Sequence, residues 1–91
     1  MKRKEVYEII DKERDYQERL SVSTFRHDDV DQSVPAELVM MKVYLDKAFN
    51  AYTANYGDQF ALADVRKVTA LGIRCLERHG CPRRSDEEDT R

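Results

Sequence analysis

The sequence contains no tryptophan, only two cysteines and no long hydrophobic run. Cys75 and Cys81 form neither a CxxC pair nor a disulfide-rich framework, so both suit free thiols in a reducing cytoplasm. No apolar run approaches the ~20 residues of a membrane span. The charged residues 1–5 are not followed by a signal-peptide hydrophobic segment. We therefore expect a cytoplasmic protein that does not enter a membrane.

The chain also lacks a strong excess of either charge, because 16 basic and 18 acidic residues leave a formal charge of −2. We therefore expect no non-specific binding to nucleic acid. The 91 residues fit one domain, which we place at residues 1–81. A domain this short buries a modest fraction of its surface, which favours completion of the core by a homo-oligomer.

The apolar residues recur at helical spacing in three segments, which predicts helices at about residues 4–20, 35–54 and 59–79. A short turn separates the last two, so they should pair as an antiparallel hairpin. Gly72 weakens a helix, and its place among apolar residues suggests a close helix crossing. The sequence therefore predicts an all-α fold of three main helices.

Helix-ending signals lie between these segments. Residues 21–33 are rich in Ser, Thr and Asp and are predicted to form a loop, with Ser33 capping the second helix. Asp58 is a candidate N-cap of the third helix, and Gly80 can end it. Residues 82–91 form a charged tail without strongly apolar residues, which predicts disorder.

Glu13 and Gln17 fall on the apolar side of the first helix, where polar groups need partners. Either they bond to a loop or helix at the edge of the apolar stripe, or Glu13 faces an internal pocket. On the third helix, a basic line of Lys67, Arg74 and Arg78, flanked by Arg66, could meet phosphates. Such a line is more often a solvated face, because charge on one side of an amphipathic helix is the default. Both alternatives remain open in each case.

Metal binding has little support in the sequence. Cys75, His79 and Cys81 are possible ligands, but a structural zinc site normally needs four, and the fourth would have to come from distant His27. We therefore expect no metal site.

Four short segments resemble small phage and prophage proteins related loosely to the MazG-like all-α nucleotide pyrophosphohydrolases. The resemblance covers about residues 5–80, and its most specific part is the Glu-Arg-x-Tyr-Gln motif at residues 13–17. The other segments are residues 33–37, 44–48 and 66–71. The resemblance implies an oligomeric helical scaffold that handles nucleotides or their phosphates.

The chain departs from that family at the acidic pairs that would hold Mg²⁺. Met40 stands three residues after Glu37, and no carboxylate lies between Val65 and Leu76. Glu13, Glu37 and Asp64 remain as scattered candidates, so hydrolysis is disfavoured and Mg²⁺ is implied only if the protein is an enzyme.

The sequence thus favours a non-catalytic module that captures a nucleotide-like ligand, such as a signalling nucleotide sequestered by a phage protein. The alternatives are a Mg²⁺-dependent nucleoside triphosphate pyrophosphohydrolase and a protein-binding helical adaptor. The predicted ligand-binding residues are Glu13, Arg14, Tyr16, Gln17, Glu37, Tyr44, Lys47, Arg66, Lys67 and Arg74.

Overall fold

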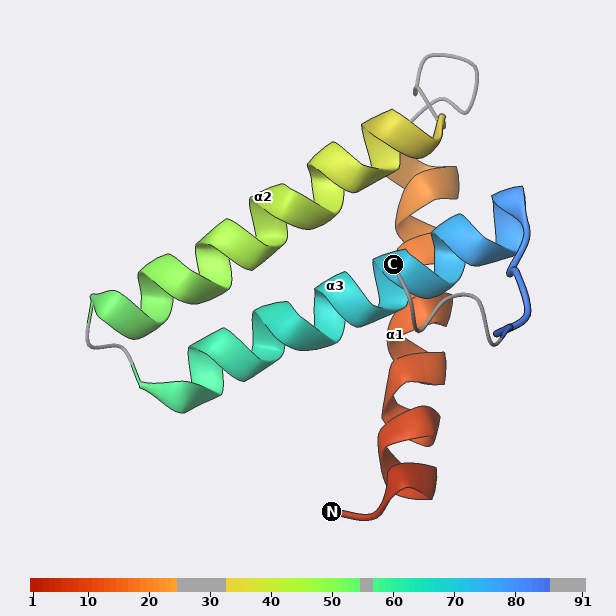
Figure 1. The fold of residues 1–91 in the computed structure, drawn as a ribbon. Coiled ribbons are helices and arrows are strands. Elements are labelled where there is room, and N and C mark those ends of the chain that lie inside the picture. Colours follow the sequence, from red (N-terminus) through yellow and green to blue (C-terminus); the bar gives the residue numbers. More distant parts are fainter. Residues whose placement is uncertain (25–32, 55–56, 86–91) are drawn as a thin grey trace.

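The computed structural model describes residues 1–24, 33–54 and 57–85, with residues 21–24 described by their helical backbone. Three helices make up the fold: α1 (Arg3–Thr24), α2 (Val34–Thr53) and α3 (Asp58–His79). No strand occurs among the described residues. The prediction of an all-α fold with three main helices is therefore confirmed (Figure 1).

The helices α2 and α3 run antiparallel and pack closely against each other, as the hairpin prediction required. Helix α1 crosses α3, and its N-terminal half continues away from the hairpin (Figure 1). An open angle therefore lies between the start of α1 and the first half of α3. No helix in the described part of the chain has both the length and the apolar character needed to cross a bilayer.

Helix α1 is longer than predicted, because residues 21–24 are helical rather than part of a loop. Ser, Val and Thr cost only tenths of a kcal/mol each in a helix, and each residue added to an existing helix gains a hydrogen bond. No Gly or Pro interrupts this segment. The rest of the predicted loop, residues 25–32, lies outside the described residues.

The two predicted N-caps have different outcomes. The Ser33 side chain accepts a hydrogen bond from the Ala36 amide at 3.3 Å, which confirms it as the N-cap of α2. Asp58 is not the N-cap of α3: Gly57 holds that position with a φ of 86°, and Asp58 is the first helical residue. There the negative charge of Asp58 still interacts favourably with the positive end of the helix dipole.

The end of α3 follows the sequence signal. Gly80 adopts a φ of 102°, which glycine tolerates better than any residue with a Cβ, and its amide bonds to the Leu76 carbonyl at 2.9 Å. Residues 82–85 of the predicted tail are described and form no helix, whereas residues 86–91 lie outside the described part.

The core of the single chain is small. Among the described residues the buried hydrophobic ones are Ile10, Ala48, Ala70 and Leu71. Three charged residues are equally well buried: Arg14, Glu37 and Arg74. Charged contacts therefore hold the three helices together to an unusual degree, and much apolar surface stays outside.

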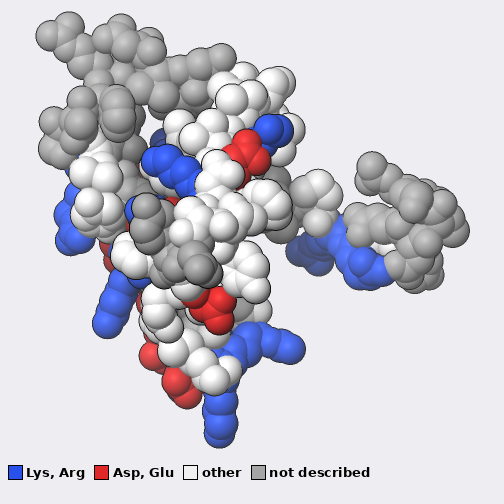
Figure 2. All heavy atoms as spheres, turned by 90° about the vertical axis from the view of Figure 1, so that its left-hand side faces the viewer, with Lys and Arg blue, Asp and Glu red and all other residues white. Residues whose placement is uncertain are grey.

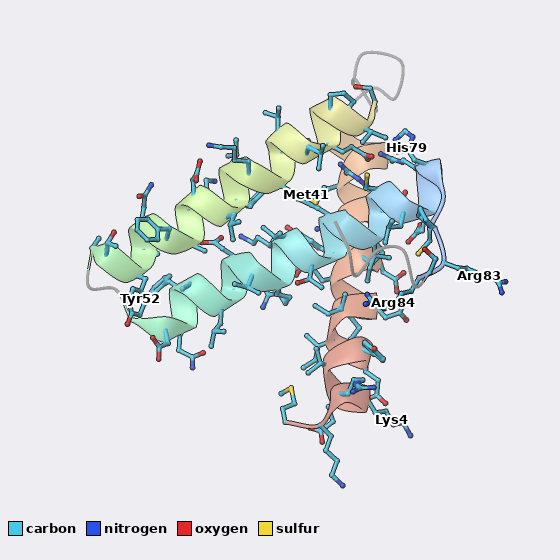
Figure 3. All side chains as sticks on the ribbon, in the orientation of Figure 1. Lys4, Met41, Tyr52, His79, Arg83 and Arg84 are labelled. Atoms are coloured by element: carbon cyan, nitrogen blue, oxygen red, sulfur yellow. The ribbon has the colours of Figure 1, made fainter. Side chains whose placement is uncertain are left out.

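Gly72 lies against Met41 where α3 packs closely on α2, but this approach does not require a glycine. A Cβ at this position would lie 3.8 Å from Sδ of Met41, which is ordinary van der Waals contact. Met41 points from α2 toward α3 (Figure 3). The structure leaves room for a methyl group here.

Gly72→Ala should therefore stabilise the protein, by about 0.5–1 kcal/mol, because alanine is the better helix former. Urea denaturation followed by circular dichroism measures the change. Gly80→Ala is the control and should destabilise, since its φ of 102° strains any residue with a Cβ. A loss of stability in Gly72→Ala would show that a methyl group does not fit beside Met41.

Candidate functional site

A buried carboxylate joins the start of α2 to the end of α3. Glu37 is only 3% exposed, and its Oε1 accepts a hydrogen bond from Nη1 of Arg78 at 3.1 Å. Nε of Arg74 lies 3.4 Å from the same oxygen, as an ionic contact without hydrogen-bond geometry. Nε2 of His79, which Figure 3 places beside the start of α2, lies 3.0 Å from Oε2. Glu37 therefore binds the two helix ends together.

The electrostatics of this cluster keep Glu37 ionised. Burial alone would raise the pKa of Glu37, but the contact with the Cys75 thiol and the guanidinium groups of Arg78 and Arg74 outweigh it and lower the pKa. Hydrogen bonding to the Glu37 carboxylate, followed by burial, raises the pKa of Cys75. Burial and then repulsion from Arg78 lower the pKa of Arg74. A carboxylate and a protonated thiol therefore face each other here.

A second buried charge, Arg14, joins α1 to α3. Its Nε and Nη2 donate to the two carboxylate oxygens of Glu77, at 3.0 and 3.1 Å, and Nη2 also donates to Glu18. The hydrogen bond from Arg14 is the main reason that the pKa of Glu18 is lowered. Because Arg14 is occupied by these two carboxylates, its contacts are structural.

Glu13 and Gln17 also turn toward α3. Oε1 of Glu13 accepts from Nε of Arg66 at 2.7 Å, and Nε2 of Gln17 donates to the Lys67 carbonyl at 3.2 Å. These contacts favour the interpretation in which the two residues bond to a neighbouring helix at the stripe edge. Neither residue lines the groove described below. The alternative that Glu13 faces an internal pocket is therefore not supported.

Three of the predicted ligand residues do come together across α2 and α3. Nζ of Lys47 lies 5.0 Å from the centre of the Tyr44 ring, and Nζ of Lys67 lies 5.9 Å from it. Both distances suit cation–π attraction. Nζ of Lys67 is 4.0 Å from Asp64, at the limit of an ion pair. The ring and two ammonium groups form a small cationic site, which we call the Tyr44 site.

The other predicted ligand residues do not join the Tyr44 site. Arg66 is bonded to Glu13, and Arg74 lies in the Glu37 cluster. Tyr16 is exposed on α1. Figure 2 agrees that basic side chains do not gather into one patch on the face it shows, since they lie apart around uncharged surface.

The three carboxylates considered for Mg²⁺ are likewise dispersed. Glu13 pairs with Arg66, Asp64 lies near Lys67, and Glu37 lies in its own cluster. Instead, ligand atoms of Glu37, Cys75 and His79 all lie within 4.8 Å of one another. Cys75 and His79, possible ligands from the sequence, do lie close together, whereas His27 lies outside the described residues. The sequence spacing of Cys75 and His79 on α3 could not indicate Glu37 as a third ligand, because Glu37 lies on α2.

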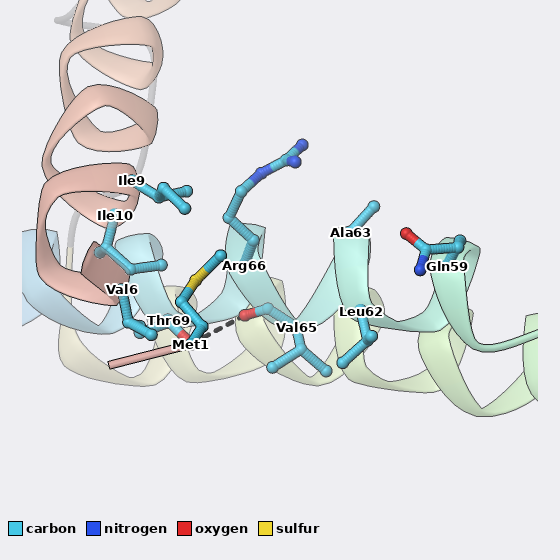
Figure 4. A pocket seen from close by; sticks show the side chains of 10 residues that line it. All are labelled: Met1, Val6, Ile9, Ile10, Gln59, Leu62, Ala63, Val65, Arg66 and Thr69. Carbon is cyan, nitrogen blue, oxygen red and sulfur yellow. Dashed lines mark hydrogen bonds between the residues drawn. The ribbon is translucent and has the colours of Figure 1, made fainter. Parts of the chain in front are cut away.

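An apolar groove lies in the open angle between α1 and α3. It has a volume of about 430 Å³, and Ile10 is its most deeply buried lining residue. Figure 4 shows Val6 and Ile9 on one wall, facing Leu62 and Val65 of α3 on the other. These four side chains are between 39% and 57% exposed. We call this feature the α1–α3 groove.

Helix α2 presents a further exposed apolar surface. Leu38, Leu45, Phe49 and Tyr52 recur at helical spacing along one side of the helix and are all more than half exposed. We call them the α2 apolar line. Met41 and Ala48 share the same helix but turn toward the interior of the hairpin instead.

Comparison with known proteins found no matching family model, no matching curated protein and no matching solved structure. Nothing in these comparisons links the chain to phage proteins or to MazG-like enzymes, so that resemblance stays a hypothesis. Function must therefore be argued from the groove, the Tyr44 site and the Glu37 cluster.

Proposed function

We propose that this protein is a helical interaction module that assembles with copies of itself. The observation that carries the proposal is the exposed apolar surface. Among the described residues the buried hydrophobic ones are Ile10, Ala48, Ala70 and Leu71, whereas 18 large hydrophobic residues are exposed. Exposed apolar surface of this extent commonly marks a site of protein–protein contact.

A second copy is the occupant that best fits the α1–α3 groove. The chain carries both a concave apolar surface, the groove, and a convex one, the α2 apolar line. An amphipathic helix seated in an apolar groove is a common mode of protein recognition. If each of two copies places its α2 line in the other's groove, one twofold axis relates two identical contacts and covers both surfaces.

Charged substitutions on either surface test this arrangement. Leu62→Lys in the groove and Phe49→Glu on the α2 apolar line should each weaken self-association at least tenfold, because each places a charge in an apolar contact. Mixing the two variants should restore association, since one of the two contacts is then unaltered and the other pairs opposite charges. Size-exclusion chromatography with light scattering measures both effects.

Val39→Glu is the matched control for Phe49→Glu. Val39 is 62% exposed on α2, close to the 69% of Phe49, but does not belong to the α2 apolar line. Its substitution should leave association unchanged. Equal weakening by Val39→Glu, or failure of the mixed variants to associate, would contradict the proposed contact.

Nucleotide capture is the second candidate function, and the Tyr44 site favours it. A tyrosine ring can stack on a base while Lys47 and Lys67 attract phosphate, and the two lysines come from different helices. Two free cysteines also agree with a cytoplasmic location. A non-catalytic role is favoured over Mg²⁺-dependent hydrolysis because Glu13, Glu37 and Asp64 each lie beside a different cation.

Isothermal titration with mono-, di- and cyclic nucleotides tests this second function. Binding should weaken at least tenfold in Lys67→Ala, because a phosphate contact is lost, and should be unchanged in Lys42→Ala. Lys42 is a suitable control because it is exposed on the same helix as Lys47 and pairs with Asp46. Absence of heat with every nucleotide in folded protein would count against capture.

A further inference from the structure

We propose that Glu37, Cys75 and His79 form a binding site for a thiophilic divalent cation of the Zn²⁺ class. This proposal does not depend on self-assembly or on nucleotide capture, because it uses none of the residues of the groove, the α2 apolar line or the Tyr44 site. The three ligand atoms already lie within 4.8 Å of one another. In a tetrahedral zinc site they would stand roughly 3.3–3.8 Å apart, so small side-chain rotations are enough to close it.

The fold fixes the relative position of the three donors. Cys75 and His79 are four residues apart on α3, which places both side chains on the same face of the helix. Glu37 approaches from the first turn of α2, and the close packing of α2 on α3 holds it there. A set made of one thiolate sulfur, one imidazole nitrogen and one carboxylate oxygen suits zinc better than it suits calcium or magnesium.

The geometry around Glu37 leaves one carboxylate oxygen facing the other two donors. Oε1 is taken by Arg78 and Arg74, whereas neither arginine hydrogen-bonds to Oε2, which is shielded from solvent. Nε2 of His79, which can also act as a metal ligand, lies 3.0 Å from Oε2. When two atoms each direct a lone pair at the other, their contact is favourable only if a proton or a cation lies between them.

The arginines hold the carboxylate in place without occupying its second oxygen. Carboxylates that ligate metals are commonly fixed by hydrogen bonds from groups behind them, and Arg78 supplies such a bond. The guanidinium charges oppose a dication, but the ionised thiol offsets one of them. The side chain of His79 is 31% exposed, so the site opens to solvent and leaves a fourth position for water.

Binding requires the Cys75 thiol to lose its proton. The S–H bond breaks, the sulfur lone pair forms the bond to the metal, and the proton passes to solvent. No electron is transferred, so the step needs no oxidant or reductant. A proton held between Nε2 of His79 and Oε2 of Glu37 must also leave, either to Nδ1 of the same ring or to solvent. Metal binding should therefore release at least one proton, that of Cys75, for each chain that becomes loaded.

Titration of Co²⁺ into the reduced, chelator-treated full chain tests the site. We expect one Co²⁺ per chain, with the near-ultraviolet absorption of a thiolate–cobalt bond and visible bands of a tetrahedral site, both removed by Zn²⁺. Cys75→Ser should abolish the thiolate band and weaken binding at least tenfold. His79→Ala should weaken binding to a similar degree. Absence of these bands in folded wild-type protein would overturn the proposal.

Cys81→Ser is the matched control, because Cys81 is a free and exposed thiol outside the cluster. It should keep the same spectrum and an affinity within twofold of wild type, whereas loss of the thiolate band in this variant would overturn the assigned ligand set. Circular dichroism checks that each variant is folded. If a variant unfolds, thermal melting of the wild type decides, since Zn²⁺ must raise its Tm above the value in chelator.

Discussion

Glu37→Ala should lower the free energy of unfolding by about 3–5 kcal/mol, the cost of removing one partner from a buried ion pair. Glu37 is 3% exposed and faces three cationic or potentially cationic groups at the junction of α2 and α3. Without it, Arg74 keeps a buried charge next to Arg78. Repulsion between the two then opposes the packing of the helix ends.

Urea denaturation at one fixed chain concentration measures the effect, with a chelator present so that bound metal does not contribute. The control is Asp46→Ala, which removes the exposed partner of Lys42 on the same helix. That variant should change stability by less than about 1 kcal/mol, because solvent screens exposed ion pairs. Equal losses of unfolding free energy in the two variants would show that Glu37 does not hold the ends of α2 and α3 together.

Ala70→Leu should have the second largest effect, a destabilisation of about 1–3 kcal/mol from overpacking. Ala70 is 0% exposed. It lies one helical turn after Arg66 and two turns before Glu77, and both of these residues bond to α1, so this face of α3 packs on α1. A larger side chain must push the two helices apart and weaken the Arg14 contacts with Glu77.

Ala63→Leu is the matched control on the same face of α3. Ala63 lines the α1–α3 groove, where a larger apolar side chain finds open space. Its stability in urea should match that of wild type or exceed it. A comparable loss in both variants would mean that α1 packs along the whole of α3, contrary to the open groove.

Helices and their pairing could be predicted from the sequence because they depend on local information. Periodic apolar residues locate the helices, and the short connection near Gly57 makes α2 and α3 antiparallel. Ser33 was recognised as a cap because its contact with Ala36 spans a single turn. The end of α1 could not be predicted, because residues 21–24 have a composition that both loops and helix ends tolerate.

The Glu37 cluster could not be predicted, because its partners are distant in the sequence. Glu37 and Arg78 are 41 positions apart, and only the packing of α2 on α3 joins them. The basic residues of α3 were interpreted as a solvated face or as phosphate contacts. Two of them, Arg74 and Arg78, instead face a buried carboxylate. Helical spacing shows which residues share a face, but not what that face meets.

The apolar stripe of α2 shows the same limit. In the single chain, one side of this stripe packs on α3 while the α2 apolar line stays exposed. The periodicity could therefore indicate that a further neighbour is needed. It could not identify that neighbour as the α1–α3 groove of a second copy, which is what we propose.

Sedimentation equilibrium of the wild-type chain at micromolar concentration tests the self-assembly account most directly. The account predicts a mass of two chains or more, because a single chain leaves its groove and its α2 apolar line uncovered. A folded species of 10.7 kDa throughout that concentration range would contradict it.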